Sequence, residues 1–193
     1  MRKLIVHEFI TLDGVIQAPG GDKEDTDGGF AHGAWTIPYW HNDIGLNFFS
    51  AFQNADALLL GRKTWYTHGE AFEAMEGDPF ADAMNGIKKY VVSTTLKDAN
   101  MWRNSTLINK DIVNAVRALK NSEGKDILMD GSSVLIHSLL PHNLIDEFIL
   151  HVYPLVLGGG KKLFPAGWHG RLKLVETKTM PTGVTMLKYT ANV

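Results

Sequence analysis

Two stretches of the chain combine glycine, hydroxyl and cationic side chains in a way suited to binding phosphate. In the first, the apolar run Ala57 to Leu60 is followed by Gly61, Arg62, Lys63 and Thr64. A buried strand that runs into a helix leaves unpaired backbone N–H groups and the positive end of the helix dipole at the junction, and such a junction binds anions. Arg62 and Lys63 add positive charge, and the arginine fork fits a ribose 2′-phosphate. The same residues also fit an ordinary turn with solvated cations.

A second stretch repeats this arrangement later in the chain. The short apolar run 127–129 leads into Gly131, Ser132, Ser133 and Val134. Glycine lets backbone approach a ligand closely, and hydroxyls and amides at a helix start hold phosphate. A third strand, 90–93, ends at Ser93 and Thr94. Because ligands of open α/β sheets lie at the carboxyl ends of the strands, we expect one crevice lined by all three ends, although helix caps and turns explain the same residues without a ligand.

Composition narrows the classes of function. The 193 residues carry a net charge of −2, which gives no basic face for nucleic acid. Cysteine is absent, which excludes disulfides, thiolate metal sites and cysteine nucleophiles. We expect a single domain over residues 1–193, in the cytoplasm, because no apolar stretch has the length of a membrane span and the N-terminus reaches Glu8 too soon for a signal-peptide core.

Strand-like and helix-like segments alternate along the chain. Strands are predicted at 3–10, 57–60, 90–93, 127–129 and 145–157, with a closing antiparallel hairpin at 172–177 and 184–189. Helices are predicted from Asp43 as the cap, at 64–75, at 80–87, from Asp111 and at 132–140. This alternation predicts an α/β fold in three layers: a mainly parallel central sheet, helices on both faces and a C-terminal antiparallel hairpin.

Several of these segments together resemble a known family. They are GRKTW after a buried strand, the VVST strand end, DGSSVL, IDEFILHVYPLVLGGGKKLFP, and TLDGVIQAPGG near the N-terminus. In combination, over essentially the whole chain, they are similar to the dihydrofolate-reductase-like superfamily, and more closely to its branch with the reductase domain of riboflavin biosynthesis. The resemblance implies a dihydrofolate-reductase-like fold and an NADPH-dependent oxidoreductase.

The resemblance also implies where the cofactor would lie. It assigns Gly61, Arg62, Lys63 and Thr64 to the adenosine phosphates, Ser93 and Thr94 to the adenine ribose, and Gly131, Ser132, Ser133 and Val134 to the pyrophosphate. These are the residues that the helix-terminus argument selects independently.

The catalytic residues are less well defined by the sequence. At the spacing from GRKT where dihydrofolate reductases carry a carboxylate in the first helix, this chain has Gly45, and Asp43 lies two residues away. Two residues are about half a helical turn, so Asp43 would point elsewhere unless the helix is shifted. Asp13 follows the first strand and is the preferred polar contact to the substrate, although it also fits a turn ahead of Gly14. The candidate catalytic residues are therefore Asp13 and Asp43.

A flat-ring substrate pocket is expected next to the nicotinamide. Its candidate residues are Asp13, Gly14, Trp35, Trp40 and Phe48. The phenylalanines of the first helix also fit a simple apolar core, whereas two tryptophans in a loop are harder to explain by packing. The acidic stretch 22–27 is either a solvated loop or a lid that would repel a phosphorylated substrate.

The expected function is NADPH-dependent reduction of a small pyrimidine- or pteridine-like molecule, resembling 5-amino-6-(5-phosphoribosylamino)uracil reductase. Two alternatives stay open: a nucleotide- or ligand-binding module without chemistry, and a pterin reductase of the dihydrofolate reductase kind. No metal site is expected, since His137 and His142 lie five residues apart across a proline. We also expect a homodimer that uses strand 145–157, whose two faces are both largely apolar.

Overall fold

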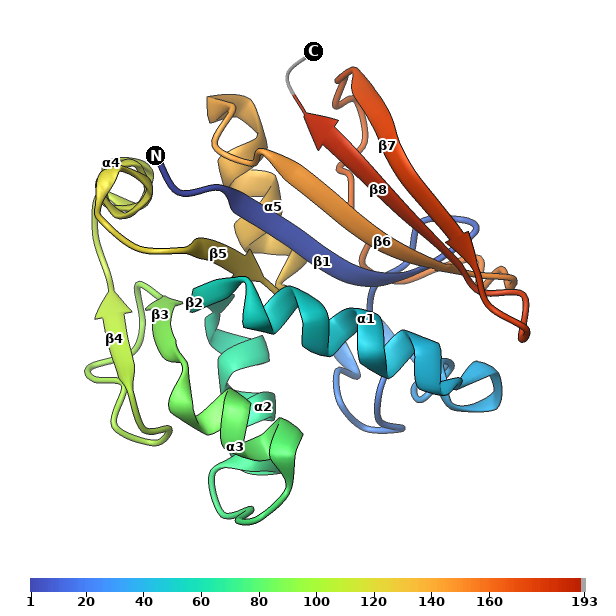
Figure 1. The fold of residues 1–193 in the computed structure, drawn as a ribbon, viewed down its shortest axis with the longest axis horizontal. Helices are drawn as coiled ribbons and strands as arrows, with labels where there is room; N and C mark the ends of the chain where they lie inside the picture. The colour runs from blue at the N-terminus through green and yellow to red at the C-terminus, as the bar shows by residue number, and fades with distance from the viewer. Residues whose placement is uncertain (192–193) are drawn as a thin grey trace.

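A mixed sheet of eight strands organises the molecule, in the order β4-β3-β2-β5-β1-β6-β8-β7 (Figure 1). The six strands from β4 to β6 are parallel neighbours, while β8 pairs antiparallel with both β6 and β7. The computed structural model describes residues 1–191. The order of the strands reverses direction around β1, since the chain leaves β1 toward β2 on one side and reaches β6 on the other. Such a reversal is where α/β sheets bind ligands.

The strands are β1 (Leu4–Thr11), β2 (Ala55–Gly61), β3 (Lys88–Val92), β4 (Ser105–Ile108), β5 (Asp126–Met129), β6 (Glu147–Tyr153), β7 (Leu172–Thr179) and β8 (Thr185–Ala191). The α-helices are α1 (Asn42–Gln53), α2 (Arg62–Phe72), α3 (Pro79–Gly86), α4 (Ile112–Asn121) and α5 (Ser133–Leu139). Three short 3₁₀ turns are η1 (Asp27–Gly29), η2 (Ile37–Tyr39) and η3 (Leu140–His142).

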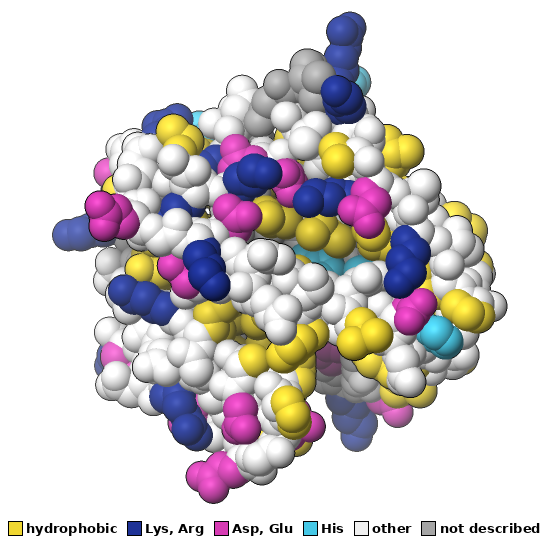
Figure 2. Space-filling model, in the orientation of Figure 1, with side chains coloured by type: hydrophobic (Ala, Val, Ile, Leu, Met, Phe, Trp, Pro, Cys, Tyr) yellow, Lys and Arg dark blue, Asp and Glu magenta, His cyan; other side chains and the backbone are white. Residues whose placement is uncertain are grey.

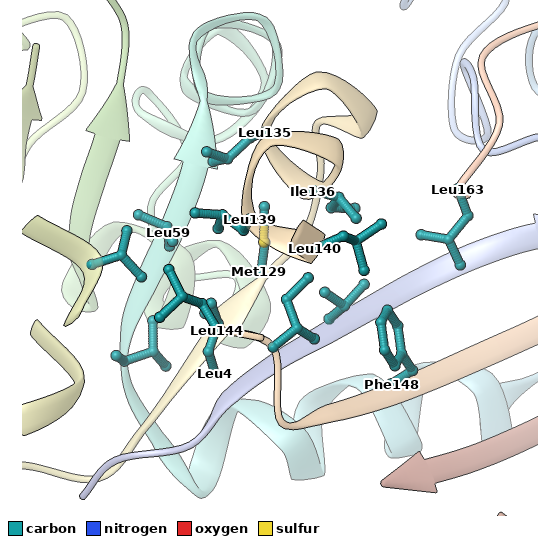
Figure 3. Close-up of a cluster of buried hydrophobic side chains, with 14 of the residues drawn as sticks. Leu4, Leu59, Met129, Leu135, Ile136, Leu139, Leu140, Leu144, Phe148 and Leu163 are labelled. Carbon is teal, nitrogen blue, oxygen red and sulfur yellow. The ribbon is translucent and has the colours of Figure 1, made fainter. Parts of the chain in front are cut away.

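Helices cover both faces of the parallel part of the sheet. Leu4 and Val6 of β1 share a core with α4 and α5, whereas Ile5 between them packs in a second core with α1, α2 and α3. Alternate side chains of a strand point to opposite faces, so both sets are buried only when both faces are covered. Figure 3 shows the first core, with Leu139 of α5 lying among Leu59 and Met129 of the sheet.

The predicted fold class is confirmed, including the C-terminal hairpin. The strand Ser105–Ile108 was not predicted, because it is a short edge strand that stays half-exposed and therefore lacks an apolar pattern. The predicted strand 145–157 is shorter, since Pro154 follows Tyr153 and cannot donate a ladder hydrogen bond. Its neighbours on both sides are β1 and β8, so it is not a sheet edge.

The first helix begins differently from the prediction. Its cap is His41, whose Nδ1 accepts a hydrogen bond from the backbone N–H of Asp43 at 3.2 Å. Asp43 itself lies in the first turn of α1. Likewise α2 begins at Arg62 rather than at Thr64, which places Arg62 and Lys63 within the first helical turn.

The surface carries charges of both signs. Figure 2 shows acidic and basic side chains interspersed over the face in view, with no patch of a single sign. Of the helices in residues 1–191, none has the length and apolar character that crossing a membrane requires.

Candidate functional site

A large cleft opens at the carboxyl ends of the central parallel strands. Its volume is about 1180 Å³, and its walls come from β1, β2 and β3, from the segment that follows β5, from the first turns of α2 and α5, from α1 and from the loop that follows β1. The cleft therefore lies where the reversal in strand order predicts a ligand site. The volume is ample for a small-molecule ligand.

The two glycine junctions predicted from the sequence meet in this cleft. A Cβ added to Gly61 would lie 2.3 Å from Oγ of Ser132, and one added to Gly131 would lie 2.7 Å from Oγ1 of Thr64. The backbone N–H of Gly61 donates to the carbonyl of Gly131 at 3.4 Å. Each junction thus fits the other only because glycine has no side chain, and two helix N-termini open side by side into one cleft.

The remaining predicted cofactor residues also lie at this end of the cleft. Ser133, Val134, Ser93 and Thr94 all line it. Oγ of Ser93 accepts the backbone N–H groups of Thr95 and Leu96 at 3.2 and 3.1 Å, so it stabilises the turn after β3. The structure therefore brings the three strand ends together as the sequence predicted.

The two predicted cations differ in their partners. Arg62 lines the cleft, is exposed, and has no ion pair or hydrogen bond among residues 1–191. The ammonium of Lys63 pairs closely with Asp27 and lies 3.8 Å from Asp25. Arg62 is thus the cation of this pair that is available to an anion in the cleft.

The acidic loop is held by lysines. Nζ of Lys161 pairs with Asp25 and, at 2.8 Å, with Asp27. Hydrogen bonds from Lys161 and Lys63 lower the pKa of Asp27 to about 2. These contacts link the loop to α2 and to the glycine-rich segment after β6, so Asp25 and Asp27 are not merely solvated and two lysines balance their charge.

The cleft also has an aromatic wall. Trp40 and Phe48 line it as predicted, together with Phe49 and Phe80. Trp35 does not: it is buried, its Nε1 donates to the carbonyl of Gln17 at 2.8 Å, and its ring packs edge-on against another buried ring. The loop tryptophan that sequence reasoning assigned to the pocket is therefore a packing residue.

The predicted catalytic carboxylates lie outside the cleft. Asp13 accepts hydrogen bonds from Oγ1 of Thr11 at 2.6 Å and from the backbone N–H groups of Leu157 and Gly158 at 3.2 and 2.9 Å. Asp13 thus connects the turn after β1 to the segment after β6. The neighbouring Gly14 adopts φ +86° in the same turn, and it also does not line the cleft.

Asp43 also does not line the cleft. Its carboxylate lies 3.3 Å from Nζ of Lys178 on β7, so it serves the surface of the hairpin. Gly45 lines the cleft instead, and a Cβ there would lie 3.2 Å from the Trp40 ring. No carboxylate therefore reaches the cleft from α1.

Sequence reasoning missed a buried carboxyl group on β1. Glu8 lines the cleft, is only 5% exposed, and its Oε1 has no hydrogen-bond partner among the described residues. Burial raises the pKa of Glu8 well above its ordinary value, the nearby charges of Asp130 and Glu24 add to this, and the backbone N–H of Gly131 opposes it. The signal was present in the sequence, because a glutamate stands inside the apolar strand LIVHEFI.

Two further acids and a histidine line the cleft together with Glu8. Nε2 of His68 donates to Asp130 at 2.8 Å, and Glu24 accepts the backbone N–H groups of Gly20 and Gly21 at 2.7 and 3.0 Å. Burial acts to lower the pKa of His68, but the hydrogen bond to Asp130 and the charges of Asp130 and Glu24 outweigh it and raise the pKa. Within residues 1–191, no three such side chains are placed to hold a metal ion.

Comparisons with known proteins agree with this architecture. The family model of the RibD C-terminal domain matches residues 2–186. The uncharacterized protein YyaP of Bacillus subtilis (strain 168) is 32% identical over 194 aligned residues, covering 97% of this chain and 94% of YyaP.

Solved structures are similar at lower identity. A putative riboflavin biosynthesis protein from Shewanella sp. PV-4 superposes with a TM-score of 0.72 at 21% identity, over 99% of each chain. Dihydrofolate reductase from Enterococcus faecalis, complexed with NADP(H) and RAB-propyl, superposes with a TM-score of 0.63 at 16% identity, over 99% of this chain and 97% of that one. The fold is therefore dihydrofolate-reductase-like, and the chain belongs to the RibD C-terminal domain family.

Proposed function

We propose that this protein is an NADPH-dependent reductase of a small, planar heterocycle of the pyrimidine or pteridine kind. The observation that carries the proposal is the meeting of two helix N-termini, at Gly61 and Gly131, in one cleft that continues to an aromatic wall. Backbone N–H groups at helix starts bind phosphate, and aromatic walls bind flat rings. Membership of a reductase-domain family supports the same conclusion.

The residues present fit NADPH. The cradle between Gly61 and Gly131, which a Cβ would fill, would hold the pyrophosphate together with Ser132, Ser133 and Val134. Arg62, exposed and without an ion-pair partner among residues 1–191, would bind the 2′-phosphate with Lys63 and Thr64 close by, and Ser93 and Thr94 would lie next to the adenine ribose. When bound, NADPH supplies hydride to a carbon of the substrate.

The aromatic wall sets the expected class of substrate. Trp40, Phe48 and Phe49 offer faces against which a planar ring would stack. The phosphate of a phosphoribosyl substrate would need Lys161, which lines the cleft but already balances Asp25 and Asp27. A neutral heterocycle is thus favoured over 5-amino-6-(5-phosphoribosylamino)uracil, the substrate named for the related riboflavin enzymes.

A binding module without chemistry is the second candidate. The observation favouring it is Gly45, which leaves α1 without a carboxylate in the cleft, since Asp43 pairs with Lys178. The same observation counts against a pterin reductase of the dihydrofolate reductase kind. Glu8 supplies an acid from a different element, so we favour the reductase.

One assay separates these functions. Loss of the absorbance of reduced nicotinamide would be followed with a panel of pyrimidines, pteridines and phosphoribosylated pyrimidines. Turnover of any member supports the reductase, and the preferred member names the substrate class. Tight binding of NADPH without turnover across the panel would favour the binding module.

A further inference from the structure

Glu8 is the one acidic residue of β1, and it lines the cleft. It shares a face of β1 with Val6 and Ile10, which are buried in the core beneath α5. An ionised carboxylate at such a position, without an ion-pair partner among the described residues, is poorly solvated, so burial favours the protonated form and raises the pKa of Glu8. The environment of Glu8 therefore favours a neutral carboxylic acid, and its Oε1 has no hydrogen-bond partner among the described residues.

The groups facing Glu8 also favour its protonated form. Asp130 approaches from the end of β5 and Glu24 from the loop after β1, and both are negative charges that disfavour a third. His68 on α2 holds Asp130 through its hydrogen bond at 2.8 Å, so the imidazole contacts Asp130 rather than Glu8. The backbone N–H of Gly131 is the group that opposes these effects.

We propose that Glu8 is the proton donor of the reduction, and that Asp130, held by His68, is a residue that positions and tunes it. The proposal rests on the reductase function above. In this reduction NADPH would transfer a hydride, which carries two electrons, to the carbon of a substrate C=N or C=O bond. NADPH would thereby be oxidised to NADP⁺. The O–H bond of Glu8 breaks as its proton bonds to the nitrogen or oxygen, leaving a carboxylate. That carboxylate regains a proton from solvent, and His68 and Asp130, each with a side chain 19% exposed, line the same cleft.

The first test does not depend on turnover. The side-chain carboxyl carbon of each glutamate would be followed by ¹³C NMR across pH in the wild-type protein, and the Glu8 signal assigned by its loss in Glu8→Gln. We expect a midpoint well above that of the exposed Glu176, and a lower midpoint in Asp130→Asn. A Glu8 signal that titrates together with that of Glu176 would overturn the proposal, whether or not a substrate is known.

The second test uses the best substrate of the panel. Glu8→Gln keeps the size of the side chain but has no acidic proton to transfer, so we expect kcat to fall at least about a hundredfold while KM and the Kd of NADPH change less than about threefold. The wild-type kcat should fall as pH rises through the pKa of Glu8, and this decline should be absent in Glu8→Gln. Glu8→Asp, which keeps an acid, should recover part of kcat, and Glu176→Gln should behave as wild type.

The outcomes distinguish this proposal from the reductase function itself. If the wild-type protein binds NADPH but reduces nothing, the function fails, and the NMR midpoint alone decides whether Glu8 is a neutral acid. If the wild type turns over and Glu8→Gln raises KM with kcat unchanged, Glu8 is a binding residue and its role as proton donor is overturned. Unchanged kcat and KM would overturn it as well.

Discussion

The predicted preference for NADPH over NADH depends on two adjacent cations whose contacts in the structure differ. Arg62 is exposed in the cleft and has no ion-pair partner among the described residues, whereas the ammonium of Lys63 contacts Asp27. We therefore predict that Arg62→Ala weakens NADPH binding far more than Lys63→Ala does. Arg117→Ala, on the exposed face of α4 and outside the cleft, is the matched control.

The magnitudes follow from these contacts. A hydrogen bond between charged groups is worth roughly 1.5–3 kcal/mol, and exposure to solvent brings Arg62 to the lower end, which is about tenfold in Kd. Lys63 would have to leave Asp27 to bind a phosphate, so its net effect is only about twofold. Asp27→Asn frees Lys63 and should tighten NADPH binding by about the same factor.

Titration of both cofactors by tryptophan fluorescence measures these effects. We expect the wild-type protein and Arg117→Ala to bind NADPH at least about tenfold more tightly than NADH, and Arg62→Ala to lose this preference while its affinity for NADH stays within about twofold. The preference should shrink as salt is added. Equal weakening of both cofactors in Arg62→Ala, or a larger loss in Lys63→Ala, would refute the assignment of the 2′-phosphate to Arg62.

Three further predictions test the cradle, the core and the assembly. Gly61→Ala places a Cβ 2.3 Å from Oγ of Ser132 and should weaken NADPH binding at least about tenfold in the same titration, whereas Gly159→Ala, with open space around it, should not. Burial lowers the pKa of His151 to about 4, so the unfolded chain binds more protons than the folded protein between pH 6.5 and 4. The free energy of unfolding therefore falls as pH falls through that window. In urea titrations, His151→Leu should remove up to about 3 kcal/mol of this loss. Light scattering should give a dimer mass, and Val175→Glu on the exposed hairpin should give a monomer; a wild-type monomer at micromolar concentration would contradict the dimer.

The structure also changes the expected location of the dimer interface. Phe148 and Leu150 of β6 are buried in the core under α5, so a charge there would unfold the protein instead of testing an interface. The exposed apolar residues of this part of the sheet are Leu174 and Val175 on β7. The homodimer stays a prediction, with the hairpin as its expected contact.

The sequence predicts best what is determined locally. A buried strand, a glycine and a helix start are encoded within a few neighbouring residues, so the junctions at Gly61 and Gly131 and the fold class could be predicted. Their meeting in one cleft followed from the rule that parallel strands end at the same edge of a sheet. The close contact between them, with Ser132 against Gly61, is a tertiary fact that no local pattern contains.

The errors lie where the path of a loop decides the outcome. Asp13 and Trp35 have residue types suited to a site, but the loop after β1 turns them toward the segment after β6 and into the interior. Glu8 was missed for a different reason. Its spacing from Val6 and Ile10 places it on a buried face of β1, and a charge on a buried face is a signal of function that the sequence did offer.

Transfer of label from the cofactor tests the central claim most directly. NADPH deuterated at C4 of the nicotinamide, on each face in turn, would be incubated with the protein and the best heterocycle of the panel, and the product analysed by mass spectrometry. We predict that deuterium from one face appears on a carbon of the product, that Gly61→Ala reduces the rate, and that Gly159→Ala does not. Saturating binding of NADPH without label in any product, from either face, would contradict the account.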